Sequence, residues 1–168
     1  NCIFTGNTAG MSGGGIYNES SAPTLTNCTI ADNSAGGGGG GGMYNKESTP
    51  MLADCMFGSN STEGSGGGIY NNSSSKPALL GCIFKGNSAL RSGGGLYNYN
   101  GSEASLNNCI FSGNRARDGG GIENHDSSSS MLLNCTFSSN FAEHLGGGIS
   151  NIQGGHLVLV NCILWADT

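Results

Sequence analysis

Charged residues are scarce in this chain of 168 residues: they make up 10% of it, and only 6 of them are Lys or Arg. A nucleic-acid-binding surface needs clustered positive charge to neutralise phosphates, so the composition argues against nucleic acid as a partner. No apolar run approaches the roughly 18 residues that a membrane-spanning helix requires, so no membrane span is expected. Helical periodicity is also missing, which leaves strands and turns as the expected elements.

Glycine is abundant, with 32 residues, and Ser and Asn are frequent, a composition that is typical of flexible linkers. The apolar residues nevertheless recur at fixed places, which a linker has no reason to do. We therefore expect an ordered chain that forms a single domain over residues 1–168.

A short phrase that begins N-C-x-F recurs with small variations and sets the organisation of the chain. Its cysteines are 26 or 27 residues apart: Cys2, Cys28, Cys55, Cys82, Cys109, Cys135 and Cys162. The repeats so defined span 1–26, 27–53, 54–80, 81–107, 108–133 and 134–160, with a partial repeat at 161–168. Because the first repeat begins within the phrase, we expect the chain to be part of a longer protein.

A period near 27 residues with short apolar stretches predicts an all-β solenoid of six full coils and a partial seventh. Each repeat fits three short strands: a G-G-G-I-Y strand, a strand with a central Leu, and a C-x-F strand. Their inward columns are Ile16, Met43, Ile69, Leu96, Ile122 and Ile149, then Leu25, Leu52, Leu79, Leu106, Leu132 and Leu159, then Phe4, Ile30, Phe57, Phe84, Phe111, Phe137 and Leu164.

The Leu and the Cys of each repeat are three residues apart, so a regular strand cannot point both into the core. A sharp bend between them would point both side chains into the core. The residues directly before the cysteines are Asn1, Asn27, Asp54, Gly81, Asn108, Asn134 and Asn161. Asn, Asp and Gly best tolerate a left-handed backbone, so we predict that this corner column turns a right-handed parallel β-helix.

The phrases FTGN, FGSN, FKGN, FSGN and FSSN alternate with GGGI or GGGL along the whole chain. This pattern resembles the paired FxxN and GGA[ILV] motifs of chlamydial polymorphic membrane proteins, and more broadly bacterial secreted right-handed β-helix repeat proteins. The chain departs from it by having Gly in place of the motif's Ala, and Ile30 in place of one Phe. The resemblance implies an extracellular or cell-surface location and an adhesin-like role.

Stacked coils place identical side chains one above another, so Asn columns can form ladders of amide hydrogen bonds. Besides the corner column, two further columns qualify: Asn7, Asn33, Asn60, Asn87, Asn114 and Asn140, and Asn18, Asn45, Asn71, Asn98, Asn124 and Asn151. The glycine triplets are expected to allow close approach of neighbouring backbones.

The cysteine column is expected to be a buried core ladder of free thiols. In-register neighbours have parallel side-chain directions that suit a disulfide poorly, and no C-x-x-C pair suggests zinc. We therefore interpret these cysteines as small apolar residues.

The densest group of reactive side chains is the segment RDGGGIENHD, with Arg117, Asp118, Glu123, His125 and Asp126. Neighbouring repeats place Tyr97 and Ser150 in the column of Glu123, so no stacked pair of carboxylates is expected there. We assign no catalytic residue, no metal ligand and no cofactor.

Two outward columns are candidate contact surfaces. The Tyr column, Tyr17, Tyr44, Tyr70 and Tyr97, is expected to form an exposed stripe that could stack on glycans or a protein partner. The Ile column follows the cysteines and is expected to be a lateral packing face: Ile3, Thr29, Met56, Ile83, Ile110, Thr136 and Ile163.

These observations predict a non-enzymatic, extracellular structural or adhesive rod of bacterial type. Its partners would be further copies, associated laterally or end to end, or other surface proteins and glycans. Two alternatives stay open: a subunit of a fibre stacked head to tail, and a carbohydrate-active enzyme similar to polysaccharide lyases.

Overall fold

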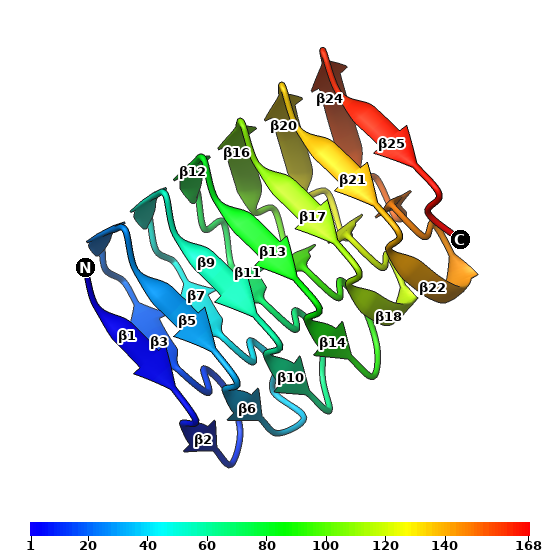
Figure 1. The fold of residues 1–168 in the computed structure, drawn as a ribbon. Helices are drawn as coiled ribbons and strands as arrows, with labels where there is room; N and C mark the ends of the chain where they lie inside the picture. The colour runs from blue at the N-terminus through cyan, green and yellow to red at the C-terminus, as the bar shows by residue number, and fades with distance from the viewer.

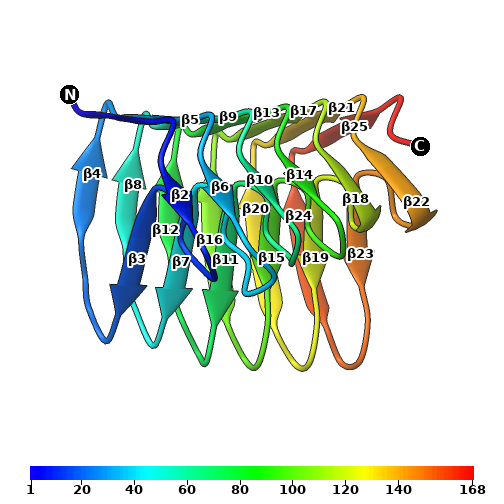
Figure 2. The ribbon, with the colours of Figure 1, turned by 90° about the horizontal axis from the view of Figure 1, so that it is seen from below.

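Each repeat of the sequence forms one coil of a parallel β-solenoid, and the coils stack along one axis with the termini at opposite ends (Figure 1). The structure is a computed structural model that describes all residues 1–168. Every strand pairs in parallel with the equivalent strand of the next coil, so the strands form four sheets that run the length of the rod (Figure 2). The prediction of an all-β parallel solenoid is confirmed.

The four sheets are named after their most regular feature. The cysteine sheet contains β1 (Ile3–Thr5), β5 (Thr29–Ala31), β9 (Met56–Gly58), β13 (Ile83–Lys85), β17 (Ile110–Ser112), β21 (Thr136–Ser138) and β25 (Ile163–Trp165). The short sheet contains β2 (Thr8–Ala9), β6 (Ser34–Ala35), β10 (Ser61–Thr62), β14 (Ser88–Ala89), β18 (Arg115–Asp118) and β22 (Phe141–Leu145).

The other two sheets complete each coil. The tyrosine sheet contains β3 (Ile16–Glu19), β7 (Met43–Lys46), β11 (Ile69–Asn72), β15 (Leu96–Asn98), β19 (Ile122–Asn124) and β23 (Ile149–Asn151). The leucine sheet contains β4 (Thr24–Thr26), β8 (Met51–Ala53), β12 (Ala78–Leu80), β16 (Glu103–Asn107), β20 (Ser129–Leu133) and β24 (His156–Val160).

The core is a set of stacked identical side chains, as the repeat predicts. Phe84 is in register with Phe57 and Phe111, and the ring centroids of these neighbours are 5.0 and 4.5 Å apart with nearly parallel planes. The inner members of the Ile, Leu and Phe columns and the internal cysteines form one buried cluster through the middle of the rod. Leu159 and Leu164, which were expected to point into the core, are 42% and 46% exposed because no further coil covers them in this structure. Each coil therefore buries its apolar side chains largely against the coils above and below.

The corner column adopts the left-handed backbone that its residue types predict. The φ angles are 53° at Asn27, 51° at Asp54, 62° at Gly81 and 54° at Asn108. Asn134 and Asn161 follow with 54° and 52°. This bend lets the Leu and the Cys of each repeat both point into the core, which confirms the explanation of their spacing.

The short sheet is an addition to the predicted coil of three strands. Its first four strands are only two residues long, and they carry Ser, Thr and Ala in place of large apolar residues. Such a strand has too few residues to display an alternating pattern, which is why the sequence did not indicate it. The coil therefore has four sides.

The third glycine of each triplet explains one departure from the motif that the sequence resembles. A Cβ atom at Gly95 would lie 2.7 Å from the carbonyl oxygen of Gly121 and 2.8 Å from Cδ1 of Phe111. An Ala in that place would collide with the backbone of the next coil and with the phenylalanine stack. The Gly residues therefore allow both close coil contact and Phe in the core.

Two of the three Asn columns form continuous amide ladders. In the first, Asn87 Nδ2 donates to Asn114 Oδ1 at 3.0 Å and to the carbonyl of Phe57 at 2.9 Å. Asn87 Oδ1 accepts from the backbone and side-chain nitrogens of Asn60 at 3.1 and 2.9 Å. In the second, Asn45 Nδ2 donates to Asn71 Oδ1 at 2.9 Å, and the pattern continues to Asn151.

The corner column forms no ladder, contrary to expectation, because its left-handed residues project their side chains into solvent. The first ladder, in contrast, continues one step further than predicted. Asp167 occupies the Asn position of the partial repeat, and its Oδ1 accepts from the backbone nitrogen and Nδ2 of Asn140, each at 2.8 Å. No helix in the structure is long and apolar enough to cross a membrane.

Replacing Asn87 with Ala should lower the free energy of unfolding by about 3 kcal/mol or more, because buried partners on three neighbouring residues lose their hydrogen bonds. The exposed end of the same ladder supplies the control: Asn7→Ala removes one side-chain contact to Asn33 and should cost below about 1 kcal/mol. Urea unfolding of both variants measures the difference. Equal losses would show that the ladder does not stabilise the rod.

Candidate functional site

The Ile column lies on the outer face of the cysteine sheet, and its apolar members are exposed as expected. The exposed fraction is 38% at Ile83, 41% at Ile110 and higher at the two ends of the column. Thr29 and Thr136 are half-buried. The column therefore presents a line of apolar side chains, one per coil, with two threonines among them.

The leucine sheet continues this apolar character around the corner. Its outer face carries two columns, one on each side of the buried leucines. The first outward column is Thr24, Met51, Ala78, Ser105, Met131 and Val158, and the second is Thr26, Ala53, Leu80, Asn107, Leu133 and Val160. None of these twelve side chains is charged.

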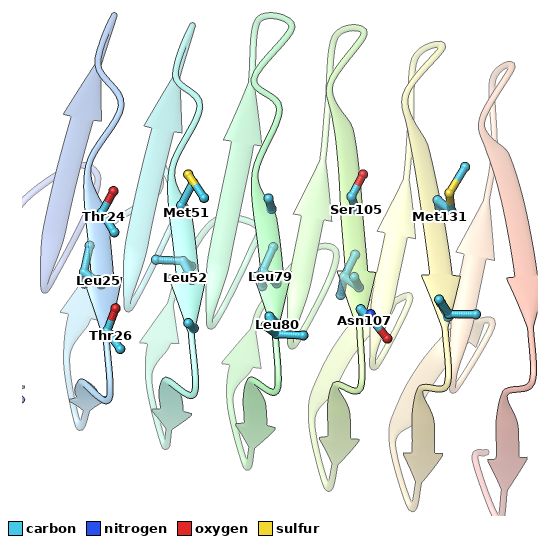
Figure 3. A pocket seen from close by; sticks show the side chains of 14 residues that line it. Thr24, Leu25, Thr26, Met51, Leu52, Leu79, Leu80, Ser105, Asn107 and Met131 are labelled. Carbon is cyan, nitrogen blue, oxygen red and sulfur yellow. The ribbon is translucent and has the colours of Figure 1, made fainter.

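A shallow groove of about 440 Å³ runs along this face between the larger side chains (Figure 3). Along the first outward column, Thr24 and Met131 stand at its two ends, with Met51, Ala78 and Ser105 between them. Leu80, Leu133, Val158 and Val160 stand out in the sequence as apolar residues near the Ile column, but of these only Val158 belongs to the first outward column, whose other members were not expected to be part of this face. The first outward column could have been found in the sequence, because its residues directly precede the Leu column in every repeat. We call the Ile column together with the two outward columns the apolar surface.

The Tyr column is not the exposed stripe that we expected. Tyr44 and Tyr97 are only 8% and 7% exposed, and Tyr70 is half-buried, so Tyr17, at 49%, is the one exposed ring of the column. The glycine-rich loops fold over the column: a Cβ atom at Gly39 would collide with the ring of Tyr70. The expectation was wrong because these loops, which have no sequence pattern of their own, cover the outer face of the tyrosine sheet.

Burial has a clear electrostatic effect on these phenols. It raises the pKa of Tyr70 and Tyr97, and the nearby Glu123 carboxylate raises that of Tyr97 further. Tyr44 accepts a hydrogen bond from Asn72 Nδ2 at 3.0 Å, and its ring stacks on Tyr17 with centroids 5.2 Å apart. The column thus packs the tyrosine sheet, and only its Tyr17 end offers an aromatic surface.

The cysteines are free thiols, and the internal ones, Cys28 to Cys135, are buried. Their sulfurs donate to backbone carbonyls at the corner, for example Cys55 Sγ to the oxygen of Ala53 at 3.3 Å. Burial raises the pKa of Cys55 to about 11, so its nucleophilic thiolate form is disfavoured. The structure places Cys2 at an exposed end and Cys162 half-buried.

The segment RDGGGIENHD forms a group of ionisable side chains where the short sheet meets the tyrosine sheet. Arg117 Nε donates to His144 Nδ1 at 2.9 Å, and this same His144 nitrogen is 4.0 Å from Asp118 Oδ1. Glu123 occupies the Tyr column and is 1% exposed, and its Oε2 has no hydrogen-bond partner. His125 Nδ1 is likewise buried and unpartnered.

Glu123 is the most perturbed carboxyl group of the chain. Burial, and secondarily the charge of Asp118, raises its pKa to about 7. Such a group could exchange a proton near neutral pH, as general acids do. However, the glycine-rich turn and the neighbouring coils close it off from solvent, so a substrate has no path to it in this conformation.

The comparisons with known proteins agree with the architecture. A family model described as a right-handed β-helix region matches residues 1–141 and, in a second, overlapping match, residues 63–166. Comparison with curated proteins and with solved structures gives no match.

The raised pKa of Glu123 predicts a specific pH dependence of stability. The folded protein holds this proton up to about pH 7, whereas the unfolded chain loses it near the ordinary pKa of a Glu side chain, 4.5. The free energy of unfolding therefore falls as pH rises between these values, and ionisation at pH 8 costs about 3 kcal/mol. Glu123→Gln cannot ionise, so its stability relative to the wild type should rise by that amount from pH 4 to pH 8.

Urea unfolding of both proteins across this pH range measures the effect. Glu63→Gln, a substitution at an exposed carboxylate that is in no ion pair, serves as the control for the loss of one negative charge. A difference between Glu123→Gln and the wild type that does not vary with pH would mean that the Glu123 carboxylate is solvated in the folded protein.

Proposed function

The chain belongs to the right-handed β-helix family, and from this premise we propose that it is a non-enzymatic, extracellular rod that binds other surface molecules through its apolar surface. The observation that carries the proposal is the extent of that surface. It covers two adjoining sheets over the length of the rod and contains no charged side chain. An exposed apolar patch that extends over two adjoining sheets of a protein is typical of a binding site.

The rigidity of the rod supports the same role. Amide ladders and stacked rings hold each coil in register with the next, so apolar side chains recur at the coil spacing of about 4.8 Å. A partner with a flat or regularly spaced apolar surface can therefore contact many coils at once. Many weak contacts in a fixed array give strong overall attachment, which is the property that an adhesive or structural rod needs.

β-Helices also occur in enzymes, so the fold alone does not separate the two classes. Glu123 is the side chain that best fits an acid catalyst, but it is 1% exposed. The apolar surface, in contrast, is accessible, but it carries no carboxylate, histidine or other side chain that could act as an acid or base on a substrate. The proposal therefore favours binding over catalysis.

A double substitution, Leu80→Lys with Ile83→Lys, should weaken binding of the protein to a methyl-terminated monolayer at least tenfold, because it places one charge on each half of the apolar surface. Both side chains are exposed, so folding should be retained. The matched control, Ser61→Lys with Ser88→Lys, adds the same charge to the short sheet and should bind like the wild type. Surface plasmon resonance measures all three proteins.

Equal binding by the two double variants would contradict the proposal. Incubating the wild type with a panel of polysaccharides, with and without calcium, tests the non-enzymatic part. We expect no release of sugar products, and release would show that the protein is an enzyme.

A further inference from the structure

The leucine sheet differs from the rest of the apolar surface in its pattern of large and small side chains. In the second coil Met51 of the first outward column is next to Ala53 of the second, and in the third coil Ala78 is next to Leu80. Met51 and Leu80 are exposed by 60% and 49%, so both project from the face. In these two coils each large side chain thus lies beside a small one.

We propose that the leucine sheet is the interface of a parallel homodimer in which a two-fold axis runs along the rod and pairs each coil with the same coil of a second copy. This inference rests on the proposed binding role of the apolar surface and names a second copy as the partner for the leucine sheet. Such an axis exchanges the two outward columns. The first outward column of one copy then faces the second outward column of the other.

This exchange brings large side chains against small ones. Met51 of one copy packs over Ala53 of the other, and Leu80 packs over Ala78. In the fifth coil Met131 meets Leu133, where the flexible thioether chain of Met can adjust. Large-to-small alternation across facing positions is what close packing of two layers requires.

The polar positions of the face meet one another in this arrangement. The two-fold axis places Ser105 of one copy opposite Asn107 of the second copy, and it brings Thr24 opposite Thr26. Hydroxyl and amide groups can each donate and accept hydrogen bonds, so polar side chains face polar ones across the interface.

The size of the face sets the expected strength of the dimer. Six coils at about 4.8 Å and five residues of each coil at about 3.3 Å give about 475 Å² per copy, or about 950 Å² in total. This area is close to the lower limit of about 1,000 Å² for a specific interface. We therefore expect a reversible dimer that dissociates on dilution.

Sedimentation equilibrium of the wild-type protein at increasing concentration should show a monomer–dimer equilibrium with no larger species. Leu80→Lys should raise the dissociation constant at least tenfold, because it sets a charge against Ala78 of the second copy. Ile83 lies three residues after Leu80, on the cysteine sheet, so Ile83→Lys should leave the dissociation constant of the dimer unchanged. Three results would overturn the proposal: the wild-type protein stays monomeric, the wild-type protein assembles without limit, or the Leu80→Lys variant dimerises as tightly as the wild type.

Cross-linking tests the orientation separately and needs no destabilising substitution. In a Cys2→Ser background, Ser105→Cys and Asn107→Cys chains are prepared apart and treated with a short bismaleimide. A mixture of the two should give much more cross-linked dimer than either variant alone, because the axis pairs position 105 with position 107. Equal yields from a single variant would exclude this register. Neither readout uses a surface ligand, so failure of the dimer is distinguishable from failure of the adhesive role.

Discussion

In-register stacking of equivalent side chains, one coil apart, is the constraint on which the rest of this structure depends. Every column must consist of residues that can lie directly against similar residues. Asn satisfies this condition inside the rod because its amide both donates and accepts, as Asn60, Asn87 and Asn114 do. Phe satisfies it by stacking ring on ring, and Gly satisfies it where backbones approach too closely for a Cβ atom. The low diversity of the sequence is a direct result.

The same constraint explains why charge is scarce. Like charges one coil apart repel each other, and within a column they would do so along the whole rod. Three pairs of opposite charges link neighbouring coils. Glu19 and Lys46 are 2.7 Å apart, Lys76 and Glu103 are 3.1 Å apart, and Arg115 and Glu143 are 2.9 Å apart. Glu123 is in no such pair: its neighbours in the column are Tyr97 and Ser150, and it keeps its proton to an unusually high pH.

Features that repeat in every coil could be predicted from the sequence, and features that depend on how loops fold could not. The left-handed corner at Asn27 and its equivalents followed from residue type and spacing, and so did the core columns. The burial of Tyr44 and Tyr97 did not, because it depends on glycine-rich loops that have no pattern of their own. Asp167 could have been found, since it is five residues after Cys162, as Asn7 is after Cys2. The candidate binding surface was half predicted, with the Ile column found and most of the first outward column of the leucine sheet missed.

Hydrogen exchange of the side-chain amides in the first Asn ladder tests the central claim most directly. If the ladder holds the coils in register, the Nδ2 protons of Asn60, Asn87 and Asn114 should exchange as slowly as the backbone amides of the cysteine sheet, because both are released only when coils separate. The exposed amide of Asn108 at the corner supplies the reference for fast exchange. Rapid exchange of the three ladder amides, at the rate of Asn108, would contradict the account.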